Sequence, residues 1–566
     1  MRKLFSKKLL SVLLASSMVI GSASALTGCG SKKNEVIKLN VYSQLANFSG
    51  KQIGWSADIL KKKFNVELNI IPEGDGVFET RMTSGNLGDI VVWGADNDKY
   101  PLAVKNNLLF GWEDDNVLDE YGPYIKKNMP DALKKNKELT KTITNGASDK
   151  LYGFGANVAL NSKDHESFFY TWDTRWDLYK KLGYPKVKNL QDYHKMLKNM
   201  QKLCPSDDSG NKVYAVSLWP DWDDAMVMYV KAMATAYYGY DELALGLYDP
   251  TNGKYHDALE EKGPYLEMLK WFNDLYQDGL IDPDSMTQTY DEMIAKVQNG
   301  GTLFSIFNYS GSLGYNTKEH TSAGKLMYCM KPEDASPIVY GMNTQGGDRV
   351  WSIGAKTEYP EKCMEIINYL ATPEGRMTME YGPKGWDYDD QKHAYLTDVG
   401  VKCQNDKNTT MGGGYKGSYH DGELQINNIT WSLDASNPDS DGETYNKESW
   451  ASYNATPSSD IEKDWRDKTG CTTINEYMEK GKYTVAPGTS FSKETQDTTL
   501  KTTWNQVTTE IKNSSWKAIY AKSDKKFDSI VAGMKKSAKK YGYDKCVEWS
   551  RNQASRRKAL EDAITR

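Results

Sequence analysis

The chain has 566 residues, with 71 lysines and arginines against 76 aspartates and glutamates, and a formal net charge of −5. This length suffices for two or more domains with a sizeable hydrophobic core. The charged fraction of 26% and the hydrophobic fraction of 39% are those of a soluble globular protein and argue against a disordered or membrane-spanning chain. The mild acidity argues against a nucleic-acid partner, which normally requires a basic face.

The N-terminal segment, residues 1–28, has the layout of a secretory signal peptide. Basic residues near the start are followed by a short apolar run over 9–20 and then by small residues. That run is shorter than the roughly 20 residues that a membrane-spanning helix needs, and no other stretch approaches that length. The sequence Leu-Thr-Gly-Cys that ends at Cys29 resembles a bacterial lipobox. The resemblance implies a lipid on Cys29, a polar tether over 29–36, and attachment to the membrane through the lipid anchor alone.

Between residues 36 and 155, strand-like and helical patterns alternate. Period-two alternation predicts a strand over 36–42, an amphipathic helix follows over 55–64, and a second strand covers 66–71. A short apolar strand over 88–93 runs into a polar loop, and 150–155 has the pattern of a strand-like crossing segment. Strands and helices in this order and spacing predict a parallel α/β sheet with right-handed crossovers.

After residue 155 the pattern is mainly helical. Residues 405–460 are rich in Gly, Asn, Asp and Ser and show little periodicity, so we expect long loops there, followed by a mostly helical C-terminal part. Helices are predicted over 174–182, 190–203, 222–237, 262–278, 287–299, 360–371 and 373–381, and strands over 213–218 and 302–307.

Five motifs in chain order carry a resemblance to a known family. They are the stretch 178–193 with Leu-Gly-Tyr-Pro, the helix that ends in Gly-Leu-Ile-Asp-Pro at 279–283, the Pro-Glu-Lys stretch 360–370 with Pro-Glu-Gly at 373–375, the Gly-rich turn 382–388, and the C-terminal stretches 526–528 and 541–545. Together they resemble the extracellular solute-binding proteins of ABC importers, in particular the large lipoprotein branch associated with oligosaccharide uptake. One departure is Asn189 or Leu190 in place of the family's Thr.

The resemblance implies an α/β protein with the two-lobe, periplasmic-binding-protein-like fold of type II solute-binding proteins, with hinge segments and extra C-terminal helices. Lobe 1 is expected to begin with 37–155, lobe 2 to take 156–335, and the chain to return to lobe 1 over 336–400. Residues 401–566 are then expected to supply long loops and helices that complete lobe 2. A ligand would be held between the lobes, which close by a hinge motion.

Candidate binding residues follow from this fold. Ligands of such sheets bind beyond the carboxyl ends of the strands, so aromatic and polar side chains just after strands are the candidates. Aromatic planes cover the apolar face of a sugar ring, while polar side chains bond its hydroxyl groups. Core packing is the alternative role of each tryptophan, and we assign Trp271, Trp465, Trp516 and Trp549 to packing. The predicted binding residues are Gln44, Trp93, Asp96, Trp172, Asp173, Arg175, Trp219, Trp222, Tyr309, Trp351 and Trp386.

Metal and cysteine chemistry has little support in the sequence. Residues 437–448 fit the spacing of an EF-hand calcium loop, but no helices flank them, and a solvated acidic loop is the alternative. The Asp-Asp-Ser-Gly-Asn stretch 207–211 lies where some relatives carry a calcium loop but lacks the later carboxylates. We therefore expect no cofactor and place no metal ligand. The six cysteines after Cys29 contain no CxxC pair, and their even number permits disulfides without choosing among pairings.

The expected function is the substrate-binding subunit of an ABC importer on the extracytoplasmic face of the cell membrane. It would capture an oligosaccharide and deliver it, as a monomer, to the permease subunits. We expect no enzymatic activity, because the sequence has no HExxH, GxSxG or P-loop motif. Two alternatives are the same fold binding a peptide or a charged uronate, which a cleft rich in Arg and Lys would favour, and a surface glycan-active enzyme with a paired carboxylate.

Overall fold

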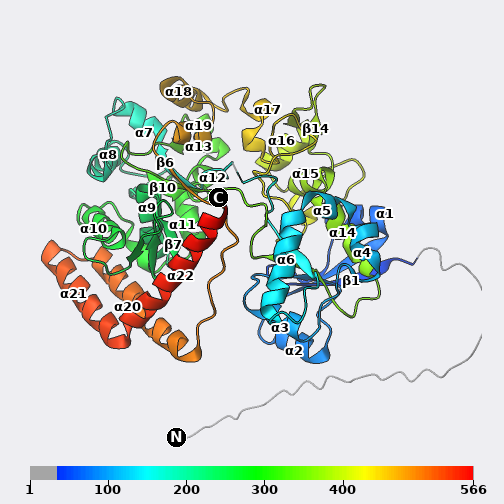
Figure 1. Cartoon of the computed structure of the whole chain (residues 1–566). Coiled ribbons are helices and arrows are strands. Elements are labelled where there is room, and N and C mark those ends of the chain that lie inside the picture. The colour runs from blue at the N-terminus through cyan, green and yellow to red at the C-terminus, as the bar shows by residue number, and fades with distance from the viewer. Residues whose placement is uncertain (1–34, 163, 565–566) are drawn as a thin grey trace, which may run out of the picture.

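The computed structural model describes residues 35–162 and 164–564. The signal segment, Cys29 and the tether up to residue 34 lie outside the described residues. Across the described ranges, no helix is both long enough and apolar enough to cross a membrane. The chain folds into two lobes, each with its own sheet and its own hydrophobic core (Figure 1).

Lobe 1 is built on a six-stranded sheet in the order β2-β3-β1-β4-β13-β5. As predicted, β1, β3 and β4 are parallel, whereas β13 is antiparallel to both of its neighbours. The alternation that predicts β1 appears in its burial, because Leu39 and Val41 are fully buried while Asn40 is exposed. The strands are β1 (Ile37–Ser43), β2 (Gly50–Lys51), β3 (Val66–Pro72), β4 (Ile90–Val92), β5 (Gly153–Gly155) and β13 (Val350–Ile353).

Helices cover both faces of this sheet. Val91 belongs to one hydrophobic cluster, while its neighbours Ile90 and Val92 belong to another on the opposite face. The helices of this lobe are α1 (Gly54–Phe64), α2 (Val77–Ser84), α3 (Lys99–Lys105), α4 (Val117–Tyr121), α5 (Pro123–Asn128), α6 (Pro130–Ile143), α14 (Pro360–Ala371), α15 (Pro373–Tyr381), α16 (Asp398–Asn405) and α17 (Ala451–Asn454). A small hairpin of β14 (Trp386–Tyr388) and β15 (Ala394–Leu396) completes the regular structure.

Lobe 2 contains a three-stranded antiparallel sheet in the order β10-β6-β11, surrounded by helices. Its strands are β6 (Tyr170–Arg175), β10 (Phe304–Phe307) and β11 (Met327–Cys329), with smaller sheets of β7 (Asp241–Leu243), β8 (Gly246–Tyr248) and β9 (Tyr255–Asp257), and of β12 (Ile338–Tyr340) and β16 (Thr484–Ala486). Its helices are α7 (Trp176–Lys181), α8 (Leu190–Leu203), α9 (Met228–Tyr238), α10 (Pro264–Gln277), α11 (Tyr290–Gln298), α12 (Ser312–Tyr315), α13 (Lys318–Ser322), α18 (Asp460–Thr469), α19 (Ile474–Glu479), α20 (Thr498–Ile519), α21 (Asp524–Tyr541) and α22 (Tyr543–Ile564).

Three predicted elements of lobe 2 differ in the structure. The helix expected from residue 174 begins at Trp176, because the chain before it forms the central strand β6. The helix expected over 222–237 begins only at Met228. The stretch 213–218 is no regular strand; it makes isolated bridges, such as Tyr214 with Thr302.

Within residues 35–162 and 164–564, the chain crosses between the lobes three times, first in the segments 156–162 and 164–168, then over 341–349 and over 455–459. The first two crossings are joined by main-chain hydrogen bonds, from Gly347 N to Ala156 O at 2.6 Å and from Ala159 N to Asn343 O at 2.9 Å. The sequence assigns 401–566 to lobe 2. In the structure, however, side chains between Cys403 and Trp450 pack in the lobe 1 core, so the last return to lobe 2 follows residue 454.

A further connection between the lobes is the extended segment 487–497, which we call the strap. It leaves β16, runs beside α22 on the side of lobe 2 that faces lobe 1, and leads to α20 (Figure 1). The strap lies on α22 through Glu494, whose N–H donates to Gln553 Oε1 at 2.9 Å. It also reaches lobe 1, where Ser492 Oγ donates to Asp96 Oδ1 at 2.9 Å. The strap therefore contacts both lobes.

Candidate functional site

Four of the predicted tryptophans belong to the hydrophobic cores. Trp93, Trp172, Trp219 and Trp351 are each at most 1% exposed. Trp93 follows β4 but points into a cluster of aromatic rings, 5.6 Å from Tyr100. Trp172 and Trp351 lie inside β6 and β13, between layers of helices. Position after or near a strand does not expose these rings, because helices cover both faces of the sheet.

Gln44 and Asp96 fix the loops at the carboxyl edge of the lobe 1 sheet. Gln44 Oε1 accepts a hydrogen bond from Gly94 N at 2.8 Å, which joins the loops after β1 and β4. Asp96 is only 3% exposed and lies 3.6 Å from Lys135 Nζ, besides accepting the bond from Ser492. Lys135 also donates to the Gly347 carbonyl at 2.7 Å, so this buried pair joins lobe 1 to the second crossing.

Asp173 and Arg175 are buried in the central strand of lobe 2. Arg175 donates two hydrogen bonds of 2.8 Å to the carboxylate of Asp177, so its charge is already paired. Asp173 accepts a bond from Ser312 N at 2.6 Å at the start of α12. Burial raises the pKa of the Asp173 carboxyl to about 6. Both side chains organise the interior of the lobe.

Trp222 and Tyr309 are the predicted residues that reach the surface together. They form an aromatic platform with two residues that the sequence analysis did not select, Phe169 and Tyr290. Trp222 stacks on Tyr290 with ring centroids 4.6 Å apart, and Tyr309 lies 5.9 Å from Trp222 and 5.7 Å from Phe169. Trp222 is 49% exposed and Phe169 is 42% exposed, so the platform is an apolar surface in contact with solvent. The remaining predicted residue, Trp386, packs against Tyr388 in the lobe 1 hairpin.

Buried rings support the platform from below. Trp219 contacts Trp222 edge-on at 5.4 Å, and Phe307 stacks on Tyr309 at 5.0 Å. The platform also adjoins lobe 1, because Ser167, two residues before Phe169, bonds to Asp434 of lobe 1 through its N–H and its Oγ, both at 2.8 Å. The aromatic surface therefore begins where the first crossing enters lobe 2.

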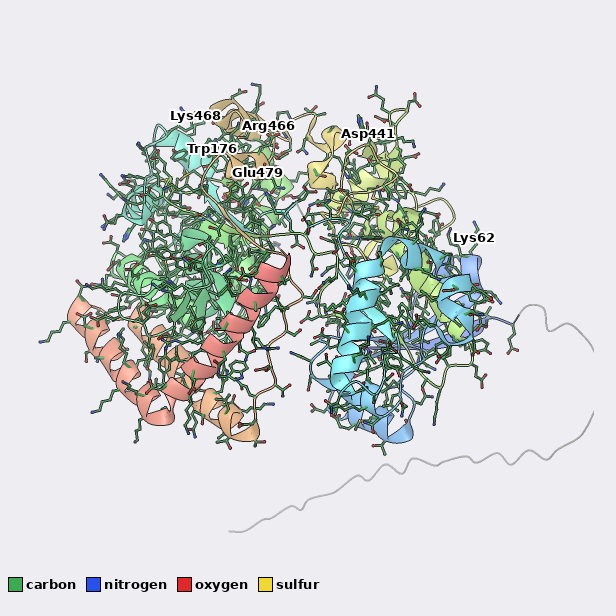
Figure 2. All side chains as sticks on the ribbon, viewed as in Figure 1. Lys62, Trp176, Asp441, Arg466, Lys468 and Glu479 are labelled. Atoms are coloured by element: carbon green, nitrogen blue, oxygen red, sulfur yellow. The ribbon has the colours of Figure 1, made fainter. Side chains whose placement is uncertain are left out.

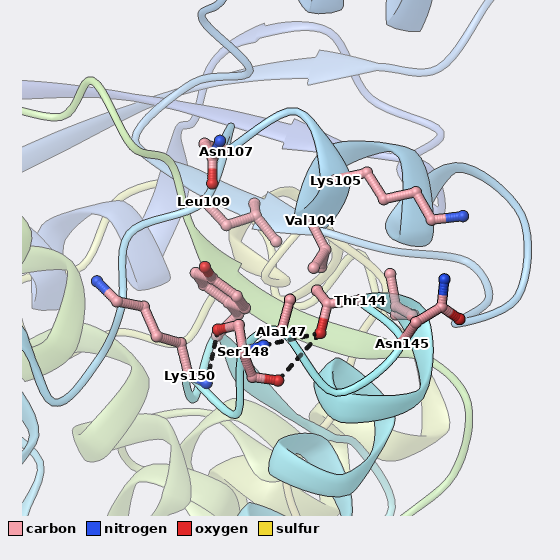
Figure 3. Close-up of a pocket in the computed structure, with 11 residues that line it drawn as sticks. Val104, Lys105, Asn107, Leu109, Thr144, Asn145, Ala147, Ser148 and Lys150 are labelled. Carbon is pink, nitrogen blue, oxygen red and sulfur yellow. Dashed lines mark hydrogen bonds between the residues drawn. The ribbon is translucent and has the colours of Figure 1, made fainter.

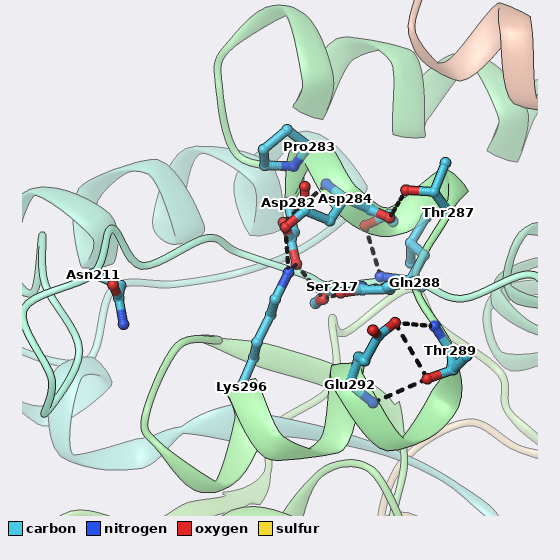
Figure 4. A network of polar contacts seen from close by, with 12 residues as sticks. Asn211, Ser217, Asp282, Pro283, Asp284, Thr287, Gln288, Thr289, Glu292 and Lys296 are labelled. Atoms are coloured by element: carbon cyan, nitrogen blue, oxygen red, sulfur yellow. Dashed lines mark hydrogen bonds and ion pairs between the residues drawn. The ribbon is translucent and has the colours of Figure 1, made fainter. Parts of the chain in front are cut away.

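A polar network holds the chain on both sides of the platform (Figure 4). Its centre is Asp282 of the Gly-Leu-Ile-Asp-Pro motif, which accepts from Ser217 Oγ at 2.6 Å and pairs with Lys296 at 2.8 Å. Gln288 donates to Ser217 Oγ at 2.7 Å and to the Leu218 carbonyl at 2.6 Å. These bonds tie the chain that leads to Trp222 to the chain that leads to Tyr290.

The start of α11 sets the position of Tyr290. Thr289 and Glu292 form a capping box, in which each side chain bonds the other's main chain. Tyr290 N donates to Asp221 Oδ2 at 2.8 Å, so the residue next to Trp222 holds the first residue of the helix. The motif Thr-Tyr-Asp-Glu marks this helix start in the sequence. A rule that selects only residues after strands does not select Tyr290, because this residue begins a helix.

A pocket that the sequence analysis did not consider lies elsewhere, in lobe 1 (Figure 3). It has a volume of about 560 Å³ and opens between the ends of α3 and α6. Its lining includes the polar side chains of Lys105, Asn145 and Lys150 and the side chains of Leu109 and Tyr152. None of the predicted binding residues lines this pocket.

The two calcium-like stretches hold no cluster of metal ligands. In residues 35–162 and 164–564, no group of three His, Cys, Asp or Glu side chains has the arrangement of a metal site. Asp208 is instead paired with His320 at 2.8 Å and with Lys325. Asp441 of the 437–448 stretch lies on the surface of lobe 1 (Figure 2). The six cysteines of the described chain are free thiols.

Comparisons with known proteins establish the fold. No family model matches the sequence, and no curated protein matches it. Solved structures match over nearly the whole chain. The alginate-binding protein AlgQ2 without calcium ion is 16% identical, with a TM-score of 0.55, and the match covers 92% of this chain and 99% of that chain. An extracellular solute-binding protein from Bifidobacterium longum subsp. infantis is 13% identical, with a TM-score of 0.58 and coverage of 94% and 100%.

A third match is the S. pneumoniae ABC-transporter substrate-binding protein FusA in complex with kestose. It is 14% identical, with a TM-score of 0.56, and the match covers 92% of this chain and 99% of that chain. At these identities the likeness establishes the fold of the chain, which is the two-lobe α/β fold of solute-binding proteins. The fold class predicted from the sequence is thus confirmed.

Proposed function

We propose that this chain is the substrate-binding subunit of an ABC importer and that it captures an oligosaccharide between its two lobes. The observation that carries the proposal is the aromatic platform, a half-exposed apolar surface at the entry of the first crossing into lobe 2. The two-lobe fold supports it, since the matched structures include an alginate-binding protein and a substrate-binding protein in complex with kestose.

The platform suits a sugar for a simple physical reason. Large exposed aromatic rings that gather in one place usually mark a binding surface, because water solvates them poorly. A pyranose or furanose ring presents C–H groups on one face, which stack on Trp222 or Tyr309, while its hydroxyl groups point outward. The Asp221 carboxylate beside Trp222 is exposed and can accept hydrogen bonds from those hydroxyl groups. A closed state is favoured only as far as the ligand contacts it better than the open state.

The other parts of the proposal concern location and partners. The chain would be anchored through a lipid on Cys29 at the extracytoplasmic face of the membrane and would act there as a monomer. It would deliver its ligand to permease subunits and would not itself change the ligand chemically. The lipobox-like sequence before Cys29 supports the anchor, and the match to an extracellular solute-binding protein and to an ABC-transporter substrate-binding protein supports the location and the permease partner.

A thermal-shift screen tests the function. The soluble form that begins at residue 30 is heated with a panel of plant, host and microbial oligosaccharides. A ligand that binds only the folded state raises the melting temperature as its concentration rises. We expect a rise with at least one class of glycan and no change in that glycan after prolonged incubation. A flat panel counts against an oligosaccharide ligand, and a chemically altered glycan would indicate an enzyme.

A further inference from the structure

We propose that the aromatic platform selects glycans that are uncharged or carry amino groups, and that it discriminates against glycans with carboxylate groups. The inference rests on the proposed function and concerns the charge class of the ligand at the same site. The observations behind it are an exposed carboxylate next to Trp222 and the lack, in the described chain, of a lysine or arginine over any platform ring.

The anionic group at the platform is Asp221. It precedes Trp222 in sequence, is exposed, and accepts a hydrogen bond from Tyr290 N at 2.8 Å, which holds its carboxylate at the main chain of Tyr290. A ligand that lies on Trp222 therefore meets negative charge.

Three buried cations of lobe 2 are paired with carboxylates. Lys231 lies 2.7 Å from Glu242, and both are largely buried. Arg557 lies 2.6 Å from Asp241 in a pair that is 9% exposed on each side. The Arg175 guanidinium is bound by Asp177, as described above. A ligand carboxylate that took one of these three cations as its partner would have to break the existing pair, and a broken buried pair leaves a charge without compensation.

The platform rings also lack a cation of their own. Lysine and arginine groups stand over a dozen aromatic rings of the described chain, among them Tyr315 and Tyr248, but over none of the four platform rings. A sugar carboxylate stacked on Trp222 would thus lie near Asp221 with no cation over the ring. Two like charges about 5 Å apart at the protein surface repel enough to weaken binding by about tenfold. A hydroxyl or ammonium group at the same place would donate to the carboxylate instead.

A matched pair of ligands tests the inference. Isothermal titration of the full soluble chain uses uronate-containing oligosaccharides and the same oligosaccharides after reduction of each carboxyl group to a primary alcohol, beside a panel of neutral and amino-sugar oligosaccharides. We expect every oligosaccharide that binds to be neutral or to carry an amino group. Where a reduced oligosaccharide binds, its affinity should exceed that of its uronate parent by about tenfold or more. Uronates that bind as tightly as their reduced forms would overturn the inference and leave the proposed function standing.

A substitution of Asp221 tests whether this residue causes the difference in affinity between the uronate and reduced oligosaccharides. D221N keeps the oxygen that accepts from Tyr290 N but removes the charge, so we expect it to narrow the difference between the uronate and reduced forms by at least threefold. D131N, which removes an exposed charge on α6 of lobe 1, is the control and should leave the difference unchanged. An unchanged difference in D221N would contradict the role of Asp221. Failure of every glycan to bind would instead remove the proposed function, and this inference with it.

Discussion

Ser492 and Asp96 join the two lobes through a hydrogen bond of 2.9 Å, between the strap of lobe 2 and the loop after β4 of lobe 1. The same carboxylate lies 3.6 Å from Lys135, which in turn bonds to Gly347 in the second crossing. A loop at the carboxyl edge of the lobe 1 sheet, the crossing and the strap are thus connected through one buried pair. Any change in the distance between the lobes at this point has to change the bond from Ser492.

S492A should loosen this connection. Loss of one hydrogen bond of ordinary strength is worth about 1 kcal/mol, so we expect the amide hydrogens of residues 94–98 to exchange about threefold to tenfold faster in the absence of ligand. Hydrogen exchange read by mass spectrometry measures this. S322A, an exposed serine on α13, is the control. Equal exchange in both variants would mean that the strap does not hold lobe 1.

Removal of the Trp222 ring should mainly lower glycan affinity, whereas removal of the Trp93 ring should mainly lower the free energy of unfolding. W222A takes a half-exposed ring from the platform, so we expect glycan affinity to fall about tenfold or more while the free energy of unfolding changes by about 1 kcal/mol or less. W93A takes a fully buried ring from the core and should lower the free energy of unfolding by about 3–5 kcal/mol. Chemical denaturation and titration calorimetry measure the two effects. Unchanged glycan affinity in W222A would remove the platform from the binding site.

Gln288 should act on binding through the position of Tyr290. Q288M keeps the side-chain volume but removes the donor that bonds Ser217 Oγ and the Leu218 carbonyl. We expect a loss of about 1–3 kcal/mol in the free energy of unfolding and a several-fold loss of glycan affinity. Q277A, which removes a more exposed glutamine at the end of α10, should leave affinity unchanged. If Q288M lost stability but kept full affinity, the network would be structural only.

Asp173 should make stability depend on pH in a defined direction. Its pKa is about 6 in the folded state, above the ordinary value of 3.8, so the folded protein holds this proton more tightly than the unfolded chain does. The contribution is therefore favourable at low pH and is lost as the pH rises through 6. The free energy of unfolding of D173N relative to the natural protein should rise by up to about 3 kcal/mol between pH 4 and pH 7. Denaturation curves across that range measure it, and a difference that stays constant with pH contradicts the raised pKa.

The sequence predicted the regular elements best where the apolar pattern is periodic. The helices over 190–203, 360–371 and 373–381 are confirmed to the residue. The strand β6 escaped prediction because all six of its residues are buried, so it shows no alternation. The assignment of 401–454 to lobe 2 was wrong because loops without periodicity carry no local sign of the core on which they pack.

The candidate site was harder to predict than the fold. Trp222 and Tyr309 lie at the surface, but Trp93 and Trp351 are buried, because a strand end does not reveal whether helices cover it. Phe169 precedes its strand and Tyr290 begins a helix, so a rule based on strand ends could not select either. Their proximity depends on contacts between distant parts of the chain, such as the bond from Tyr290 N to Asp221.

Titration of the soluble chain and of W222A with one glycan from the thermal-shift panel tests the central claim most directly. The account predicts one binding site per chain, a loss of affinity of about tenfold or more in W222A, and recovery of the glycan unchanged. Binding that is equally tight in W222A would contradict the assignment of the platform. The absence of heat with every glycan of the panel would contradict the function itself.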